Sequence, residues 1–141
     1  MNQAAILYPM AALALWTLAV LLLIPYQRVR AGRAGRVRTS DFKYGESANV
    51  PPEVSIPNRN MMNLLELPVL FYAVCLTFYV SHTVSHAIVA LAWTYFVLRV
   101  IHSVIHLSYN SVMQRLAAFA MSNFVLTTLW VLLLLTLPAA G

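Results

Sequence analysis

The sequence predicts an all-α integral membrane protein built as one four-helix bundle. Of its 141 residues, 61% are hydrophobic and 9% are charged, whereas soluble domains carry about 25% charged residues. Four apolar stretches reach the roughly 20 residues that a helix needs to cross a bilayer; they cover about residues 4–26, 61–81, 87–107 and 116–138. Because these spans use nearly the whole chain, we predict a single membrane domain over residues 1–141.

The first span, residues 4–26, is followed by a run of arginines. Seven of the nine Lys and Arg residues lie in the connection over residues 28–60, and the short link over residues 81–86 has none. The positive-inside rule therefore predicts that the long connection is a cytoplasmic loop and that both termini lie outside. A basic run beside a span favours anionic membrane lipids as partners and argues against nucleic acid.

Prolines and short links organise the remaining spans. Pro51, Pro52 and Pro57 favour an extended chain over residues 50–57, and Asn58 is a candidate cap for the second helix. The link between the second and third spans is short, so these helices should be antiparallel neighbours. An equally tight connection over residues 109–112 pairs the third and fourth spans in the same way.

One polar stripe runs along the second span and another along the third. At about 100° per residue, the first stripe holds Arg59, Asn63 and Glu66. The second stripe consists of Tyr95, Arg99, His102, His106 and Tyr109. An ionisable group inside a span carries an insertion penalty of roughly 2.5–3.5 kcal/mol, so these stripes are the first place to look for a functional site.

Antiparallel packing places the two stripes at similar depth. Glu66 lies about 10 Å along its helix from Arg59, and His102 lies about as far from Tyr109. We therefore expect Glu66 to lie within hydrogen-bonding or water-bridged reach of Arg99 or His102. Such a cluster leaves donors for an anionic ligand, whereas the simpler alternative is an interhelical clasp between Glu66 and Arg99.

Histidine pairs raise the alternative of a metal or haem site. His102 and His106 are four residues apart, as are His82 and His86, and this spacing allows both rings of a pair to bind one metal. Neither pair has a further Cys, Asp or His beside it in the predicted topology. The sequence therefore predicts no metal site.

The two stripes, in their order and spacing, resemble the MAPEG family (membrane-associated proteins in eicosanoid and glutathione metabolism). The matching pattern is Arg59-x3-Asn63-x2-Glu66 followed by Pro68, then Arg99-x2-His102-x3-His106 and Arg115. The chain length, the four spans and the basic first loop are similar as well. The resemblance implies a homotrimer that binds glutathione between subunits and acts on lipophilic substrates. The chain is more like the short bacterial members of the family, which implies a bacterial inner membrane.

The resemblance also implies roles for individual residues. Glutathione would be bound by Arg28, Arg30, Arg59, Asn63, Glu66, Arg99, His102 and His106. Asn63 and Glu66 would hold its backbone and amino end, and Arg28 or Arg30 would reach the site from the adjacent protomer. Arg115 would be the catalytic residue, because a nearby guanidinium lowers the pKa of a thiol and only the thiolate attacks well.

Two departures from the family pattern keep a second function open. His106 and Phe119 stand where the family usually has tyrosine, although Tyr109 lies one turn from His106. One hypothesis is therefore a transferase or peroxidase that uses glutathione or a related thiol on lipophilic electrophiles. The other is a non-catalytic lipid-binding protein or an accessory subunit of a membrane complex.

Overall fold

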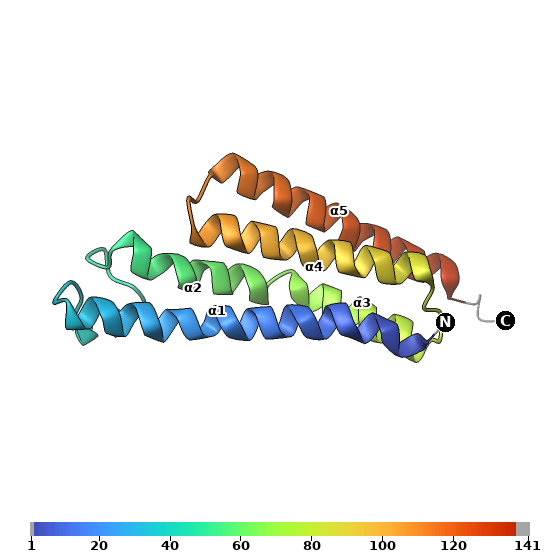
Figure 1. Cartoon of the computed structure of the whole chain (residues 1–141), viewed down its shortest axis with the longest axis horizontal. Coiled ribbons are helices and arrows are strands. Elements are labelled where there is room, and N and C mark those ends of the chain that lie inside the picture. Colours follow the sequence, from blue (N-terminus) through green and yellow to red (C-terminus); the bar gives the residue numbers. More distant parts are fainter. Residues whose placement is uncertain (1, 138–141) are drawn as a thin grey trace.

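Long apolar helices lie side by side in the computed structural model, which describes residues 2–137 (Figure 1). They are α1 (Leu7–Arg33), α2 (Pro52–Leu65), α3 (Pro68–Val80), α4 (His86–Leu107) and α5 (Val112–Thr136). Short 3-10 turns cover Gln3–Ile6 and Thr39–Phe42. Among the described residues there is no strand, and four helical segments are long and apolar enough to cross a membrane, with α2 and α3 forming one of them. The predicted all-α membrane fold is confirmed.

The helices extend beyond the spans predicted from hydropathy. Helix α1 continues to Arg33 instead of ending near residue 26, and α5 begins at Val112 instead of near residue 116. Hydropathy detects only the apolar part of a helix, whereas the backbone hydrogen bonds continue through the polar interface. Helix α5 ends at Thr136, and the final residue of the predicted span 116–138 lies outside the described residues.

The loop predicted over residues 28–60 is largely helical at both ends. Helix α1 includes residues 28–33, and α2 begins at Pro52, where a missing N–H removes no helical hydrogen bond. Pro57 lies inside α2, in its second turn, where it removes one helical hydrogen bond. Pro51 is extended as predicted, but residues 52–57 are helical, so the predicted extended chain is wrong for that part of the segment. The predicted cap at Asn58 is wrong as well, because Asn58 lies inside α2.

The connection between α1 and α2 is held against the end of α1. A small apolar cluster joins them, formed by Ala31, Val37, Val50 and Val54 with Phe42 packed on it. Two ion pairs reinforce it: Arg28 binds Glu46 at 3.3 Å, and Arg36 binds Glu53 on α2. The basic connection is thus a folded cap on this end of the bundle.

The second span breaks near its middle, between α2 and α3. Glu66 has φ −77° and ψ −91°, outside the helical region, and α3 starts at Pro68. A proline inside a helix lacks a donor, and its ring clashes with the carbonyl four residues earlier, which here belongs to Leu64. The continuous helix predicted over residues 61–81 is therefore divided in two.

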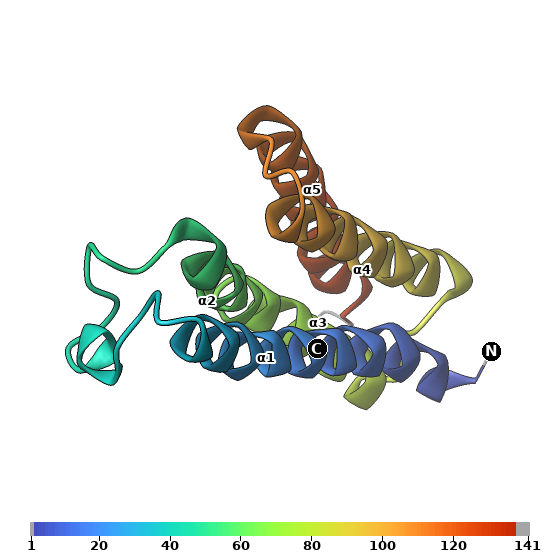
Figure 2. The ribbon, with the colours of Figure 1, turned by 60° about the vertical axis from the view of Figure 1, so that its left-hand side comes forward.

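The break separates two halves of the bundle, which we call the loop half and the core half. The core half surrounds α3, and its largest buried side chains include Leu13, Phe71, Phe78 and Leu129. The loop half surrounds α2 and includes two connections, the one between α1 and α2 and the one between α4 and α5. Figures 1 and 2 show α4 and α5 as a pair on one side of α1, α2 and α3. Helix α4 contacts both α1 and α2.

Candidate functional site

The buried polar side chains of the protein concentrate in the loop half, where α2 faces α4. Helix α4 contributes four buried residues, Arg99, His102, Ser103 and His106, and α2 contributes Asn60. These four α4 residues recur at spacings of three and four, which place them on one helical face. The face is directed inward because the rest of α4 is apolar and can meet lipid.

Arg99 is the deepest charged group of this cluster. Its side chain is fully buried, and Nη2 donates a hydrogen bond of 2.5 Å to the backbone carbonyl of Asn63. The guanidinium carbon lies 5.8 Å from the centroid of the Phe119 ring. Nε and Nη1 are buried without a hydrogen-bond partner among the described residues. Arg99 therefore joins α2 to α4 and keeps two donors for a ligand or water.

The two histidines lie between Arg99 and the loop end of α4. Nδ1 of His102 lies 3.0 Å from the backbone carbonyl of Arg115, so this nitrogen carries the proton and donates. Nε2 of neutral His102 is then an acceptor, and it has no partner among the described residues. The rings of His102 and His106 meet edge to face with centroids 6.1 Å apart. His102 is thus oriented by α5 and presents its free nitrogen to the site.

Arg115 lies at the start of α5, on the rim of a pocket. Its Nη1 donates a hydrogen bond of 2.6 Å to the side-chain oxygen of Asn110. The pocket has a volume of about 230 Å³ and is lined by Asn63, His102, Val112, Arg115, Leu116 and Phe119. The site therefore sets a cation, an amide and an imidazole against an apolar wall.

A buried pair that the sequence analysis missed joins α2 and α4 beside this pocket. Nδ2 of Asn60 donates a hydrogen bond of 2.5 Å to Oγ of Ser103, and both side chains are fully buried. Each residue directly follows a member of a predicted stripe, Arg59 or His102. The sequence therefore contained the information that Asn60 and Ser103 lie at similar depth on antiparallel helices. Small uncharged residues such as these are common in any sequence, so this pair did not stand out.

Of the hydrogen-bonding or water-bridged reach predicted between Glu66 and Arg99 or His102, the direct hydrogen bond is absent among the described residues. The Glu66 side chain is exposed, and the described residues show no hydrogen bond or ion pair from it to Arg99 or His102. The helix break at Glu66 takes this residue off the regular face of α2, so Arg99 binds the carbonyl of Asn63 instead. Arg59 is exposed as well, on the same helix.

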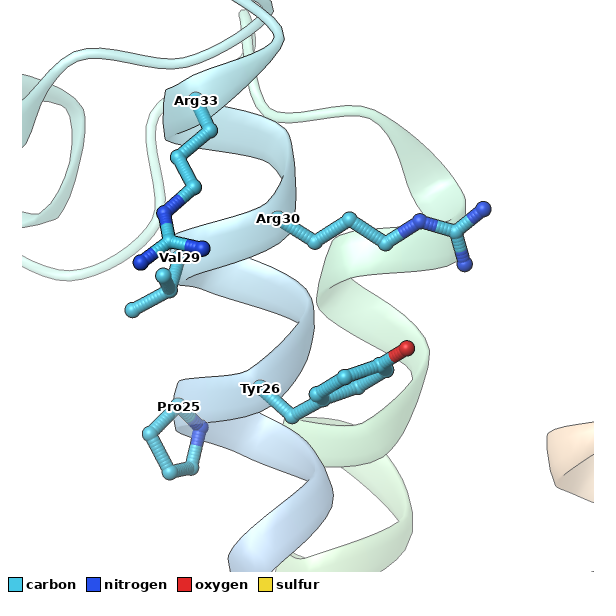
Figure 3. Close-up of a pocket in the computed structure, with 5 residues that line it drawn as sticks. All are labelled: Pro25, Tyr26, Val29, Arg30 and Arg33. Atoms are coloured by element: carbon cyan, nitrogen blue, oxygen red, sulfur yellow. The ribbon is translucent and has the colours of Figure 1, made fainter.

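The two candidate arginines of α1 differ in their surroundings. Arg28 pairs with Glu46 and lies over the Phe42 ring, with its guanidinium carbon 4.5 Å from the ring centroid. Arg30 is exposed, and its side chain extends away from the axis of α1 (Figure 3). Neither arginine lines the pocket beside Arg115 within one chain.

Comparison with known protein families identifies the family to which the chain belongs. The profile of the MAPEG family matches residues 6–135. The chain belongs to the MAPEG family. The match covers both polar stripes and the pocket beside Arg115, and it confirms the resemblance drawn from the residue pattern. Searches of curated proteins and of solved structures gave no significant match. Membership in this family and four apolar helical segments identify a multi-pass membrane protein.

Proposed function

We propose that this MAPEG-family member binds glutathione or a related small thiol and transfers it to lipophilic electrophiles or uses it to reduce hydroperoxides. The observation that carries the proposal is the position of Arg115 in a pocket that also holds His102 and Asn63. A cation supports ionisation of a thiol. The apolar wall excludes water, which strengthens that interaction, and can accept a lipophilic partner.

Arg115 is the residue proposed to stabilise the thiolate. Among the described residues it has no acidic partner, and its hydrogen bond goes to the neutral amide of Asn110. Its charge is therefore available to an anion. A thiol pKa lowered by two units would correspond to about 2.7 kcal/mol of preferential thiolate binding.

The rest of the thiol would occupy the cluster behind the pocket. The unpartnered Nε and Nη1 of Arg99 and Nε2 of His102 are available to polar groups of the peptide. Asn63 lines the pocket and offers an amide side chain. These groups suit the carboxylates and amides of glutathione, which are the polar features of that molecule.

The proposed functional unit is a homotrimer with sites between subunits. Glu66 is exposed on the surface of one chain although it lies within a membrane-spanning segment. A carboxylate facing lipid is costly, so a neighbouring copy or a bound ligand would cover it. Arg28 or Arg30 of that copy would complete the site, and His106 would support it from behind. The excess of arginine in the α1–α2 connection favours a cytoplasmic location for the loop half, with both termini outside.

The test is thiol binding by the detergent-purified protein. Glutathione should bind, and ultraviolet absorbance near neutral pH should show the thiolate. Arg115→Leu should remove the thiolate signal while retaining most of the affinity, whereas Arg38→Leu, which changes an exposed arginine of the connection, should alter neither. Conjugation of glutathione to an aryl halide should follow the thiolate signal. Absence of thiolate in the wild type at saturating thiol would contradict the catalytic proposal.

A second candidate function is non-catalytic, either lipid binding or an accessory role in a membrane complex. It is favoured by Phe119, which lines the pocket without a hydroxyl group where the family usually has tyrosine. It predicts no binding of glutathione at all. The binding measurement therefore separates the two candidates before any substrate is known.

A further inference from the structure

The outward face of α1 in the loop half carries an open pocket away from the buried polar cluster. It is lined by Pro25, Tyr26, Val29, Arg30 and Arg33, all from this one helix, and has a volume of about 580 Å³ (Figure 3). The buried residues of α1, such as Ile24 and Ala31, lie on the opposite side of the helix. This pocket therefore lies on the outer surface of the protomer, on the side of α1 that is turned away from the other helices.

The arginines of this region divide into paired and unpaired groups. Arg28 is neutralised by Glu46, and Arg36 by Glu53. Arg30 and Arg33 are exposed and have no acidic or hydrogen-bonding partner among the described residues. The two cations that line the pocket therefore have no counter-charge among the described residues.

The pocket lies at the depth of the lipid headgroups. Helix α1 has 27 residues, which makes it about 40 Å long, whereas the hydrocarbon layer is about 30 Å thick. The apolar part of α1 ends near Pro25, and Tyr26 is a residue type typical of the membrane interface. Arg30 and Arg33 follow about 6 and 10 Å further along the helix. Both guanidinium groups are therefore within reach of phosphate groups.

The side-chain directions fit the same location. The Arg33 side chain runs back along α1 toward Val29, while Arg30 and Tyr26 extend on the other side of the helix (Figure 3). Helical side chains lean toward the helix N-terminus, which on a helix leaving the membrane returns them to the headgroup layer. Pro25 and Val29 lie on the same side of the helix as Arg33 and add an apolar surface beside it, whereas Tyr26 lies beside Arg30.

We propose that this face of α1, through Arg30 and Arg33, binds the phosphate of an anionic glycerophospholipid. The guanidinium groups would donate hydrogen bonds to the phosphate oxygens, and the apolar surface of Pro25 and Val29 would contact the glycerol and the first carbons of the acyl chains. Tyr26 would border the headgroup. This lipid site lies outside the pocket beside Arg115. Of its two cations, only Arg30 is also a candidate for the thiol site of a neighbouring copy, and Arg33 is not.

The experiment measures lipid selectivity in nanodiscs of phosphatidylcholine containing a minor fraction of phosphatidylglycerol. Native mass spectrometry of the protein after its release from the nanodiscs reports which lipid stays bound to it. The wild type should retain phosphatidylglycerol selectively. Arg30→Ala/Arg33→Ala should lower that selectivity by about 30-fold, the effect of losing two arginines near an anionic surface. Arg33→Ala alone should lower it several-fold and leave glutathione binding unchanged.

The matched control is Arg38→Ala/Lys43→Ala, which removes the same charge from exposed residues of the connection that do not line this pocket. It should retain the selectivity of the wild type. Equal losses in both double variants would show only general attraction and would overturn the proposal. Unchanged selectivity in Arg30→Ala/Arg33→Ala would do the same. Loss of glutathione binding in Arg33→Ala would assign the pocket to the thiol site and would also overturn it.

Discussion

The core half and the loop half of this bundle bury opposite kinds of side chain at similar depth in the protein. Around α3, the buried residues are aliphatic and aromatic, and Phe71 stacks on Tyr95 with ring centroids 4.4 Å apart. Around α2, Arg99, His102 and Asn60 are buried instead. The first arrangement is stabilised mainly by close packing, although the Tyr95 hydroxyl is buried there without a partner among the described residues. The second arrangement needs partners for several charged and polar side chains.

This difference shows where stability and function are separated in a small membrane protein. The loop half leaves several buried polar atoms without partners among the described residues, including Nη1 of Arg99 and Nε2 of His102. Such atoms are costly unless a ligand or water binds them. The core half therefore holds the helices together, and the loop half has the free hydrogen-bonding capacity that a ligand site requires.

The largest expected effect is loss of packing in the core half. Phe71→Ala removes a fully buried ring and should lower the free energy of unfolding by about 3–5 kcal/mol. Reversible unfolding in mixed micelles measures the change. Phe124→Ala, at a ring that is 75% exposed on α5, is the control and should change stability by less than about 0.5 kcal/mol. Glutathione affinity of the folded Phe71→Ala protein should stay unchanged, and a large loss there would show that the halves are coupled.

The next effect concerns the pocket of the loop half. Arg115→Leu should raise the pKa of bound glutathione by about two units, because it removes the cation beside the thiol, and this corresponds to about 2.7 kcal/mol. A pH titration of thiolate absorbance measures the shift. Arg115→Lys should restore part of it, since a lysine keeps the charge but not the guanidinium geometry. An unchanged titration curve in Arg115→Leu would remove Arg115 from the proposed chemistry.

A smaller effect is expected from the buried contact between α2 and α4. Asn60→Ala should cost about 1–3 kcal/mol of stability, because it leaves the Ser103 hydroxyl buried without its partner. The double variant Asn60→Ala/Ser103→Ala should cost less than the sum of the single variants. A double-mutant cycle on unfolding free energies measures this coupling. Additive costs would mean that the hydrogen bond does not stabilise the loop half.

The smallest effect is a pH dependence in the connection that caps the loop half. The backbone N–H of Arg38 and the hydroxyl of Ser47 donate to Asp41 and lower the pKa of its carboxyl below the usual 3.8. The charged form stabilises this turn, so the contribution is present above pH 3.8 and is lost as pH falls through the lowered pKa. The protection of the amides over residues 38–47 against exchange, relative to the intrinsic rate at the same pH, should therefore fall in acid. Asp41→Asn should remove this acid dependence, and an unchanged profile would contradict the assignment.

The fold class and the family followed from local features of the sequence. Apolar runs of membrane length require helices, because a helix satisfies its own backbone hydrogen bonds in lipid. The spacing of Arg99, His102 and His106 placed them on one face of α4, and the structure buries all three. The MAPEG match over residues 6–135 confirms the family that the same pattern indicated. Periodicity and composition were sufficient for the fold class, whereas the family was indicated by the resemblance of the residue pattern to that family.

Tertiary structure alone decided which partner each polar group finds. The sequence shows Pro68, a residue that interrupts helices, but it does not show which groups bond across the break at Glu66. The hydrogen bond from Arg99 to the Asn63 carbonyl depends on the way in which α2 packs against α4. The helical turn over residues 53–57 likewise depends on Val54 packing in one apolar cluster with Ala31 of α1, which overrides the local preference for extended chain before Pro57. Partner choice depends on how neighbouring helices are rotated and how closely they approach, whereas periodicity in a sequence determines only the face of a helix on which a residue lies.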